Sequence, residues 1–376
     1  IAQLGILPKH VWENIPAGNF PLSDINLSPV GSGPFSFREI KKSSDGTVKS
    51  IVLKANPNYY EGRPYLDRIT FNFYPDVESM MAAFQSKEIQ AMGYVPYDKK
   101  ASENLPPNYT QLTISLPQYQ AAFFNLKTPI FADKSVRQAL WLTTERDPII
   151  NDVYLGLAKP AYGPILEGNL GYDPHIKEMT HFNLDEAKGI LDKAGWVIDP
   201  ESNIRTKNKK PLEFTLTSNN NILNIKTAKI LQEQWNRLNI NVQLAIVSPT
   251  DLEQQYLRPR AFDVLLFGEN TGADPDPFPF WHSTQARDPY FNLSGFSDPT
   301  ADKLLNQARQ TNDANARSQA YIQFQAIFAD QIPAIFLNST VYVYEVPKKL
   351  KGIELSTITH QSERFLDVAH WYIKTK

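Results

Sequence analysis

The chain of 376 residues contains no cysteine. This absence excludes disulfide bridges, thiolate metal sites and catalysis by a cysteine nucleophile. The chain also lacks any run of 18 apolar residues, so the sequence predicts no helix that spans a membrane. An excess of basic residues is missing too, because 38 Lys and Arg stand against 40 Asp and Glu, for a net charge of −2. We therefore expect no nucleic-acid partner.

Motifs for phosphate binding and for nucleophilic catalysis are missing as well. Gly31 and Gly33 are followed by proline and a predicted strand, not by the helix N-terminus that a phosphate requires. No Gly-x-Ser-x-Gly sequence occurs. The six histidines form no helical metal pair, and the closest two, His175 and His181, are six residues apart across a predicted loop. We predict no metal, no cofactor and no enzymatic activity.

The chain does contain ample material for a large folded protein. Hydrophobic residues make up 42% and aromatic residues 12%, which suits two domains better than one. The first residues lack an initiator methionine and the charged and apolar regions of a signal peptide. We therefore expect the chain to be cut at this point, with any targeting segment upstream.

The first third of the chain, 1–118, is predicted to be rich in strands. An Asp-Gly pair at 45–46 indicates a hairpin between strands at 35–40 and 48–55. A strand at 69–74 and a short helix at 77–85 are predicted to follow. A short apolar strand at 120–126 and a helix capped by Asp133 then open the next part of the chain.

From residue 183 onward, helices and strands alternate. Asn183 and Glu186 have the spacing of a helix cap, and Thr250 with Glu253 has the spacing of a second one. Such alternation predicts a parallel α/β sheet with right-handed crossovers. The predicted strands lie at 212–217, 240–246 and 262–267, with helices at 222–238 and from 250, then a helix capped by Asp298, a helix at 316–329 and a strand at 334–344.

The most unusual segment lies shortly after the strand at 262–267. Between 274 and 281, three prolines alternate with Asp274, Asp276 and three large aromatic residues. Proline fixes φ and removes a backbone donor, so we predict neither a helix nor a central strand, but an ordered loop. Acids and aromatic rings displayed together are typical of a binding site. The alternative interpretation is that the two Asp-Pro units only form turns.

Polar side chains gather where two of the parallel strands are predicted to end. In an open α/β sheet, ligands bind beyond the carboxyl ends of the strands. The candidate ligand-binding residues at these two ends are Asn219, Asn220, Asn221, Asn270, Thr271 and Asp274. The alternative is that the three neighbouring asparagines merely cap the next helix.

Short motifs along nearly the whole chain match one known family. Each is weak alone, but together their order and spacing are highly specific. They include Leu-Pro-Lys-His at 7–10, Val-Gly-Ser-Gly-Pro-Phe at 30–35, Asn-Pro-Asn-Tyr-Tyr at 56–60, Phe-Asn-Leu-Lys-Thr-Pro-Ile-Phe at 124–131, Val-Arg-Gln-Ala-Leu at 136–140, the loop at 274–283 and Ser-Gly-Phe-Ser-Asp-Pro at 294–299. The chain resembles the large extracytoplasmic solute-binding proteins of the peptide/nickel ABC importer type.

This resemblance implies a fold. It implies a two-lobed α/β protein of the periplasmic-binding-protein type (class II, cluster C), with mixed sheets and a hinge. Lobe one would comprise 1–118 and 339–376, and lobe two 119–338, with crossings near 119–125 and 336–340 that permit closure on a ligand. Because the family has a further segment before Leu-Pro-Lys-His, the resemblance also implies that the N-terminal part of lobe one is missing.

The resemblance implies a function as well. It implies an extracytoplasmic monomer that captures short peptides in the cleft between its lobes and delivers them to ABC permease subunits, with a possible lipid anchor through the missing N-terminus. Asp274 occupies a position similar to that of an aspartate that pairs with the ligand's α-amino group in peptide-binding relatives. Tyr119 near the first crossing and Trp281 beside the acidic loop complete the candidate ligand-binding residues.

The ligand class is left open at one position. A tryptophan common in the family is replaced by Glu269 or Asn270, so another oligomeric solute or a metal chelate is an alternative ligand. A hydrolase that uses Asp274 and Asp276 as its two carboxyl groups is an alternative from a different class. Carboxylates two residues apart in a proline-locked loop suit that chemistry poorly, because it needs two carboxyl groups facing each other across a defined gap.

Overall fold

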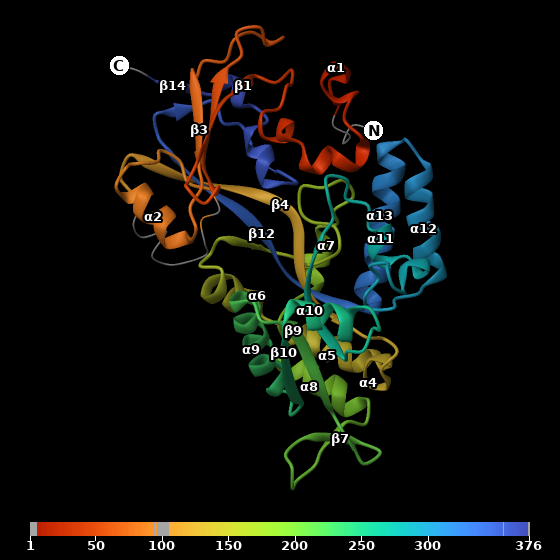
Figure 1. The fold of residues 1–376 in the computed structure, drawn as a ribbon. Coiled ribbons are helices and arrows are strands. Elements are labelled where there is room, and N and C mark those ends of the chain that lie inside the picture. Colours follow the sequence, from red (N-terminus) through yellow and green to blue (C-terminus); the bar gives the residue numbers. More distant parts are fainter. Residues whose placement is uncertain (1–5, 94, 96–104, 356, 375–376) are drawn as a thin grey trace. The chain divides into compact units, whose positions relative to one another are not determined.

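The computed structural model describes residues 6–93, 95, 105–355 and 357–374 (Figure 1). The chain divides into two compact units. Unit 1 comprises Ile1–Ile114 with Tyr342–Lys376, and unit 2 comprises Ser115–Val341. The lobe boundaries at 118/119 and 338/339 suggested by the sequence stay a prediction. Residues 1–5, on which the expected cut at the N-terminus bears, lie outside the described residues.

The predicted hairpin of unit 1 is confirmed. The strands β1 (Phe35–Lys42), β2 (Val48–Ala55) and β3 (Arg68–Asn72) form an antiparallel sheet in this order. Asp45 Oδ1 accepts a hydrogen bond from Thr47 N at 2.9 Å, and Gly46 adopts a φ of +86°, which glycine tolerates because it has no Cβ. The predicted helix is also present as α2 (Val77–Gln85), with Asp76 capping its first turn.

The remaining elements of unit 1 are short. They are α1 (Lys9–Trp12), the 3₁₀ helices η1 (Ala17–Leu22), η2 (Asp24–Leu27), η6 (Gln361–Phe365) and η7 (Val368–His370), and the strands β13 (Leu350–Lys351) and β14 (Tyr372–Ile373). β13 and β14 pair in antiparallel fashion. Phe365 and Trp371 bring aromatic rings from this tail together, 5.6 Å apart between ring centres.

Unit 2 is built on a mixed sheet with the strand order β10-β9-β11-β4-β12-β5. The strands are β4 (Tyr109–Phe124), β5 (Ala158–Pro160), β9 (Glu213–Asn219), β10 (Asn241–Val247), β11 (Val264–Asn270) and β12 (Ala334–Pro347). β10, β9 and β11 run parallel, as the sequence predicts. β4 is antiparallel to β11, and β5 is antiparallel to β12. The outer ends of β4 and β12 belong to unit 1.

The strand predicted at 120–126 is wrong in its extent, because β4 already begins at Tyr109 and contains Pro117. Proline normally argues against a central strand, since it cannot donate to the ladder. The last pair between β11 and β4 joins Asn270 to Gln118, so β11 ends just before Pro117. A residue in an antiparallel ladder directs its N–H and C=O to the same neighbour. An N–H at Pro117 would therefore point beyond the end of β11, so its absence removes no hydrogen bond of the ladder between β4 and β11.

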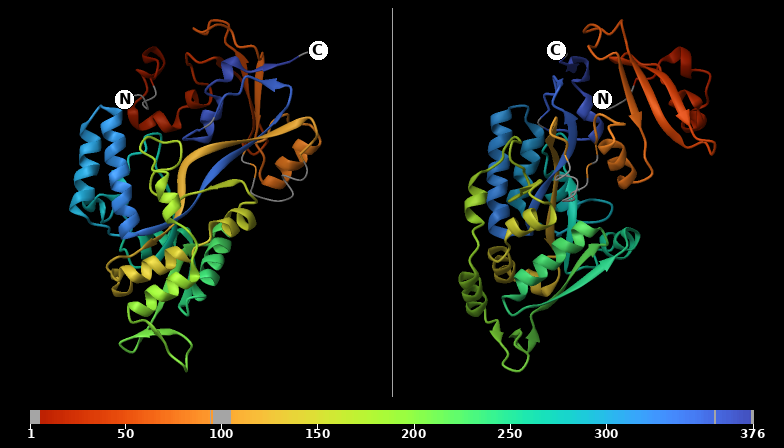
Figure 2. Two further views of the ribbon diagram at one scale, coloured as in Figure 1. Left: turned by 180° about the vertical axis from the view of Figure 1, so that it is seen from behind. Right: turned by 90° about the vertical axis from the view of Figure 1, so that its left-hand side faces the viewer.

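Thirteen helical segments belong to the described part of unit 2. They are α4 (Pro129–Ala132), α5 (Lys134–Leu142), α6 (Arg146–Pro148), η3 (Ile149–Val153), α7 (His175–Met179), α8 (Leu184–Lys193), α9 (Ile222–Asn236), α10 (Pro249–Asp251), η4 (Leu252–Leu257), α11 (Phe278–Trp281), η5 (Ser283–Gln285), α12 (Pro299–Gln310) and α13 (Ala314–Gln331). α12 and α13 lie side by side (Figures 1 and 2), and the small sheet of β6 (Val197–Ile198), β7 (Arg205–Lys207) and β8 (Lys210–Pro211) projects from one end of the unit.

Across the described ranges, no helix has both the length and the apolar character needed to cross a bilayer.

Three of the four predicted helix caps are confirmed. Asp133, Asn183 and Asp298 each accept a hydrogen bond from a backbone N–H in the first turn of the following helix. The cap predicted at Thr250 is wrong. Ser248 is the capping residue, and it accepts from Asp251 N at 3.1 Å. Proline follows Ser248 and is well suited to the first helical position, so the helix begins two residues earlier than predicted.

An aromatic core fixes the elements around the candidate site. Trp281 of α11 stacks on Phe123 of β4 at 5.9 Å and meets Phe328 of α13 edge-on at 4.6 Å between ring centres. Phe328 in turn lies 5.4 Å from Phe336 of β12. All four side chains are buried. Burial of such large rings contributes strongly to stability, so α11 is held firmly against the sheet.

Candidate functional site

The carboxyl edge of the unit 2 sheet brings several predicted residues to one place. Asn270 is the last residue of β11 and pairs with Gln118 of β4. Thr271 then closes the edge, because its N and Oγ1 both donate to Pro117 O, at 2.8 and 2.9 Å. Neighbouring polar groups on two strands thus form a fixed rim from which the proline-rich loop departs.

Asn219 lies at the same edge of the sheet, but further back along the strand direction than Asn270. Leu216 of β9 pairs with Val264 of β11, so Asn219 is level with Phe267, three residues before Asn270. At roughly 3.3 Å per residue, this offset is about 10 Å along the strands. The two strand ends therefore share an edge, but β11 extends beyond β9 at the rim.

Two of the three neighbouring asparagines, Asn219 and Asn221, accept hydrogen bonds from backbone N–H groups. Asn221 caps α9 and accepts from Leu223 N at 2.9 Å, which is the capping role given as the alternative from the sequence. Asn219 Oδ1 accepts from Asn221 N at 3.1 Å and from Asn224 Nδ2 at 2.8 Å. Asn220 is exposed.

An amide chain that the sequence did not predict continues from Asn219 into the protein. Asn224 Oδ1 accepts from Gln120 Nε2 at 2.7 Å, and Gln120 Oε1 accepts from the Tyr154 hydroxyl at 3.4 Å. Gln120 stands two residues from Gln118, so both side chains lie on the same face of β4. This period-two spacing was the available signal, and it was missed because the strand was expected to begin at residue 120.

Tyr119 and Trp281 are core residues and not accessible to a ligand in this structure. Tyr119 is 2% exposed and Trp281 is fully buried. The Tyr119 hydroxyl donates to Glu269 Oε2. Both were expected among the ligand-binding residues because they stand near the predicted crossing and the acidic loop. Their side chains point to the aromatic core instead, so they pack beneath the candidate site and do not line it.

The proline-rich segment contains one turn of helix, which the sequence prediction excluded. α11 spans Phe278–Trp281, with Pro277 as its capping residue and Pro279 in its first turn. Proline is compatible with the first turn because the N–H groups there have no partner within the helix. The exclusion of a helix was therefore wrong for these four residues, although the preceding residues 272–277 form no helix or strand.

Both carboxylate oxygens of Asp276 accept hydrogen bonds from other residues of the protein. Its Oδ1 accepts from Phe278 N at 3.0 Å, and its Oδ2 accepts from Arg309 Nε at 2.7 Å. The Arg309 guanidinium also lies over the Phe278 ring, 3.7 Å from its centre. Asp276 therefore ties the loop to α12 and serves as a turn former, in agreement with the alternative interpretation of this Asp-Pro unit.

Asp274 is engaged only in part. Its Oδ1 accepts from Arg317 Nη2 at 2.6 Å, whereas Oδ2 makes no hydrogen bond with the described residues. The Asp274 side chain is 61% exposed, and that of Arg317 is 22% exposed. Arg317 belongs to the first turn of α13, and no motif of the sequence marks it as a partner of Asp274. The two acids of the loop thus have different surroundings, and only Asp274 offers a carboxylate oxygen to the outside.

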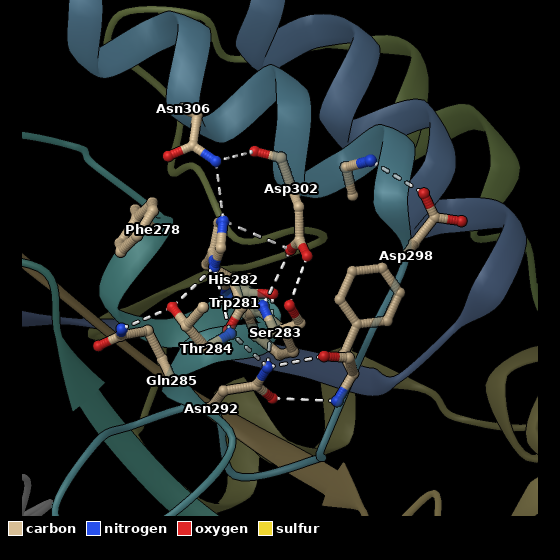
Figure 3. A network of polar contacts seen from close by, with 12 residues as sticks. Phe278, Trp281, His282, Ser283, Thr284, Gln285, Asn292, Asp298, Asp302 and Asn306 are labelled. Carbon is tan, nitrogen blue, oxygen red and sulfur yellow. Dashed lines mark hydrogen bonds and ion pairs between the residues drawn. The ribbon is translucent and has the colours of Figure 1, made fainter.

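A polar network around His282 fixes the end of the loop (Figure 3). The Asn306 amide lies 2.9 Å from His282 Nε2, and Thr284 N donates to His282 Nδ1 at 3.2 Å. Asp302 reaches from α12 and accepts from Ser283 N at 2.9 Å and from the Ser283 hydroxyl. Since the hydroxyl donates to the aspartate and not to the imidazole, these residues do not form a nucleophile–base pair.

Glu269 is a buried acid beneath the rim. It is 5% exposed. Its Oε2 accepts from the Tyr119 hydroxyl, and its Oε1 has no hydrogen-bond partner among the described residues. Burial raises the pKa of Glu269 well above its ordinary value of 4.5, while the Tyr119 hydrogen bond and the charge of Arg260 act in the opposite direction. Burial also raises the pKa of the Tyr119 phenol. Glu269 is therefore neutral at a pH where an exposed glutamate is ionised.

Replacing Glu269 by glutamine is expected to stabilise the protein increasingly as the pH rises. The unfolded glutamate ionises near pH 4.5, whereas the folded one holds its proton to higher pH, so the wild type loses stability above pH 4.5. A glutamine does not ionise, so Glu269→Gln loses no stability from this cause above pH 4.5. The advantage of Glu269→Gln should grow by up to about 1.4 kcal/mol per pH unit above roughly pH 5, and be constant below about pH 4. Urea unfolding at pH values from about 4 to 7 measures it.

The matched control is Glu201→Gln, because Glu201 is exposed in a surface turn. Its free energy of unfolding should follow that of the wild type at every pH. If the curve of Glu269→Gln also ran parallel to that of the wild type, the buried acid would not be neutral in the folded protein.

A separate hollow of about 1970 Å³ belongs wholly to unit 1. Its wall includes the polar face of the β1-β2-β3 sheet, with Lys41, Lys54 and Arg68, and acids such as Glu39 and Asp67. None of the residues predicted from the sequence lines it. Both signs of charge are present in its wall, so it shows no preference for one class of ion, and it is not part of the candidate site.

Comparison with known proteins decides the family. Residues 3–291, well over half of the chain, match the family model of bacterial extracellular solute-binding proteins, family 5 (middle). The chain belongs to this family. The resemblance inferred from the sequence motifs is thereby confirmed.

Relatives within family 5 differ in the ligands that their names state. The oligopeptide-binding protein AppA of Bacillus subtilis (strain 168) is 31% identical over 372 residues, which cover 98% of this chain and 66% of AppA. The nickel-binding protein NikA of Staphylococcus aureus is 26% identical over 338 residues, which cover 89% of this chain and 64% of NikA. The chain thus spans slightly less than two thirds of the length of either relative.

Solved structures of family 5 proteins confirm the fold. AppA from Bacillus subtilis, solved in complex with a nonapeptide, is similar with a TM-score of 0.67 and 29% identity, over 99% of this chain and 72% of that one. HbpA2 from Haemophilus parasuis is similar with a TM-score of 0.82 at 22% identity, over 98% of this chain and 69% of that one, which bears on the fold alone. The α/β fold of a periplasmic binding protein, expected from the sequence, is confirmed.

Proposed function

We propose that this protein is the substrate-binding component of an ABC importer and captures short peptides outside the cytoplasm for delivery to permease subunits. The observation that carries the proposal is Asp274, which presents one carboxylate oxygen on a proline-stiffened loop beyond the carboxyl end of β11. Membership of family 5 supports it. The division into lobes at 118/119 and 338/339, and action as a monomer, are part of the same proposal.

The chemistry of the rim suits a peptide. A terminal ammonium forms a charge-assisted hydrogen bond with a carboxylate, and a rigid loop loses little entropy when it binds. Peptide groups need both donors and acceptors, which amide side chains such as those of Asn219, Asn270 and Gln118 supply. Recognition of termini and backbone would tolerate varied side chains, as an importer of short peptides requires.

A metal chelate is the second candidate ligand, since a nickel-binding protein is among the relatives. It finds less support in this chain, because Asp274 is the only acid of the loop with an oxygen to offer among the described residues. A carboxylate hydrolase is not favoured. Asp276 has both oxygens engaged, so it cannot act as the partner acid or base of Asp274.

Native mass spectrometry of the protein purified without denaturation tests the proposal. We expect a series of bound masses that correspond to short peptides, released on unfolding in acid. Calorimetry with a defined tripeptide, Ala-Ala-Ala, should then give saturable binding to the ligand-free protein. A bound metal chelate, or turnover of the tripeptide by the purified protein, would contradict the proposal.

A further inference from the structure

The end of β11 is held from one side of the sheet. Its ladder with β9 covers the first two residues of the strand, whereas its ladder with β4 continues to Asn270. Thr271, the next residue, is also held by β4, through Pro117 O. Gly268 lies in the same stretch, and glycine weakens a strand because it loses the most backbone entropy on folding. We therefore expect the rim at Asn270 and Thr271 to open more readily than the rest of the sheet.

Glu269 supplies the side-chain contact that joins this end to β4. It is paired with Tyr119 in the ladder, and the Tyr119 hydroxyl donates to its Oε2. Backbone and side chain of one residue pair thus connect the two strands directly before the rim. Glu269 Oε1 and the indole N–H of Trp281 have no hydrogen-bond partner among the described residues. Buried polar atoms without partners cost free energy, so the contact is sensitive to a change in charge.

An anion at Glu269 would find little support from its neighbours. Arg260, in the turn after η4, attracts it, but two nitrogens of that guanidinium already donate to backbone carbonyl oxygens, and Asp288 attracts the same cation. Tyr119 offers its hydroxyl hydrogen, and burial raises the pKa of its phenol well above 10, so it stays neutral. Burial outweighs these contacts and raises the pKa of Glu269. With the rim closed, Glu269 therefore keeps its proton.

We propose that Glu269, Tyr119 and the rim residues Asn270 and Thr271 form a latch that a proton controls. While Glu269 holds the proton, its contact with Tyr119 keeps the rim closed. Opening exposes the carboxyl group to water, where it ionises, so each opening releases a proton. Bacterial extracellular solute-binding proteins meet the pH of their surroundings directly. The rim is then closed in acidic surroundings and opens more often as the pH rises, whatever the ligand.

Hydrogen exchange measured by mass spectrometry tests the latch in the protein without ligand. The readout is the protection factor, the exchange rate of an unstructured amide divided by the observed rate, which removes the ordinary effect of pH on exchange. In the wild type, protection of the segment with Asn270 and Thr271 should fall by up to about tenfold per pH unit above roughly pH 5. The interior of β4 at 121–124, which is fully buried, should stay better protected at every pH.

Three variants separate the proton from the other contacts of the rim. Glu269→Gln should give the same rim protection at every pH, because glutamine has no proton to release. Tyr119→Phe should lower the protection throughout and leave its pH dependence in place, since it removes the hydroxyl and keeps the acid. Glu201→Gln, which neutralises an exposed acid, should reproduce the wild type.

Two outcomes would overturn the latch through the role of the proton. They are a wild-type rim whose protection does not change with pH, and a pH dependence that survives in Glu269→Gln. Equal protection of the rim and the β4 interior would overturn it as well, because Glu269 would then be exposed only by global unfolding. Thermal unfolding checks the fold of each variant. If Glu269→Gln does not fold, Glu269→Met takes its place, since methionine has a similar volume and no charge.

Discussion

Asp274→Ala is expected to weaken binding of a free-amino tripeptide by roughly 10- to 150-fold, which corresponds to a charge-assisted hydrogen bond of about 1.5–3 kcal/mol. The carboxylate is held by a loop stiffened by Pro275, Pro277 and Pro279, so its alignment costs little entropy. The side chain is 61% exposed and shares its charge with Arg317, so we expect the lower part of this range. Calorimetry with the wild type and the variant measures the loss.

An N-acetylated tripeptide is the matched ligand for this prediction. It has no ammonium, so Asp274→Ala should hardly change its affinity. The two ligands and two proteins form a double-mutant cycle, from which the coupling between Asp274 and the ammonium follows directly. Equal losses for both ligands would mean that Asp274 only shapes the loop, as Asp276 does.

Arg137→Met is expected to lower the free energy of unfolding by about 2–4 kcal/mol. Arg137 is 5% exposed and caps the end of α13, where Nε donates to the carbonyl oxygens of Gln331 and Ile332, both at 3.1 Å. A further nitrogen donates to Phe131 O. Methionine fills similar space but leaves these buried carbonyls without a partner and the negative helix end uncompensated. Urea denaturation measures the loss.

Lys134→Met is the control for this prediction, because it removes a cation from the same helix end. Lys134 Nζ pairs with Asp330 at 2.6 Å, but the two side chains are 43% and 60% exposed. An exposed ion pair contributes about 0–1 kcal/mol, so the stability should change little. A similar loss in both variants would mean that the charge matters at this helix end and that the buried carbonyl bonds do not.

Features that depend on neighbouring residues were predictable from the sequence. The hairpin at Asp45-Gly46 needs only a residue that tolerates positive φ, and the cap at Asn183 needs only a side chain that reaches the first turn. The parallel arrangement of β9, β10 and β11 follows from alternating patterns of strand and helix. The sequence also located the acidic loop after β11, because proline has few allowed conformations.

Where local rules failed, a neighbouring strand or residue changed the outcome. Pro117 marks the end of a strand by propensity, yet β4 continues through it because β11 stops one residue earlier. Thr250 has the spacing of a cap, yet Ser248 takes that role because proline follows it. In both cases the misleading residue is compatible with the observed structure once its partner is known.

The tertiary structure alone decided how the candidate residues divide their roles. By itself, the sequence determined a family 5 solute-binding protein with an α/β sheet, and it placed two similar Asp-Pro units in one loop. Folding brings Arg309 to Asp276 from 33 residues away and Arg317 to Asp274 from 43 residues away, and it turns Trp281 into the core. No local pattern encodes such pairings, because they depend on how α12 and α13 pack against the sheet. The physical difference between the two acids is one carboxylate oxygen, engaged in Asp276 and available in Asp274.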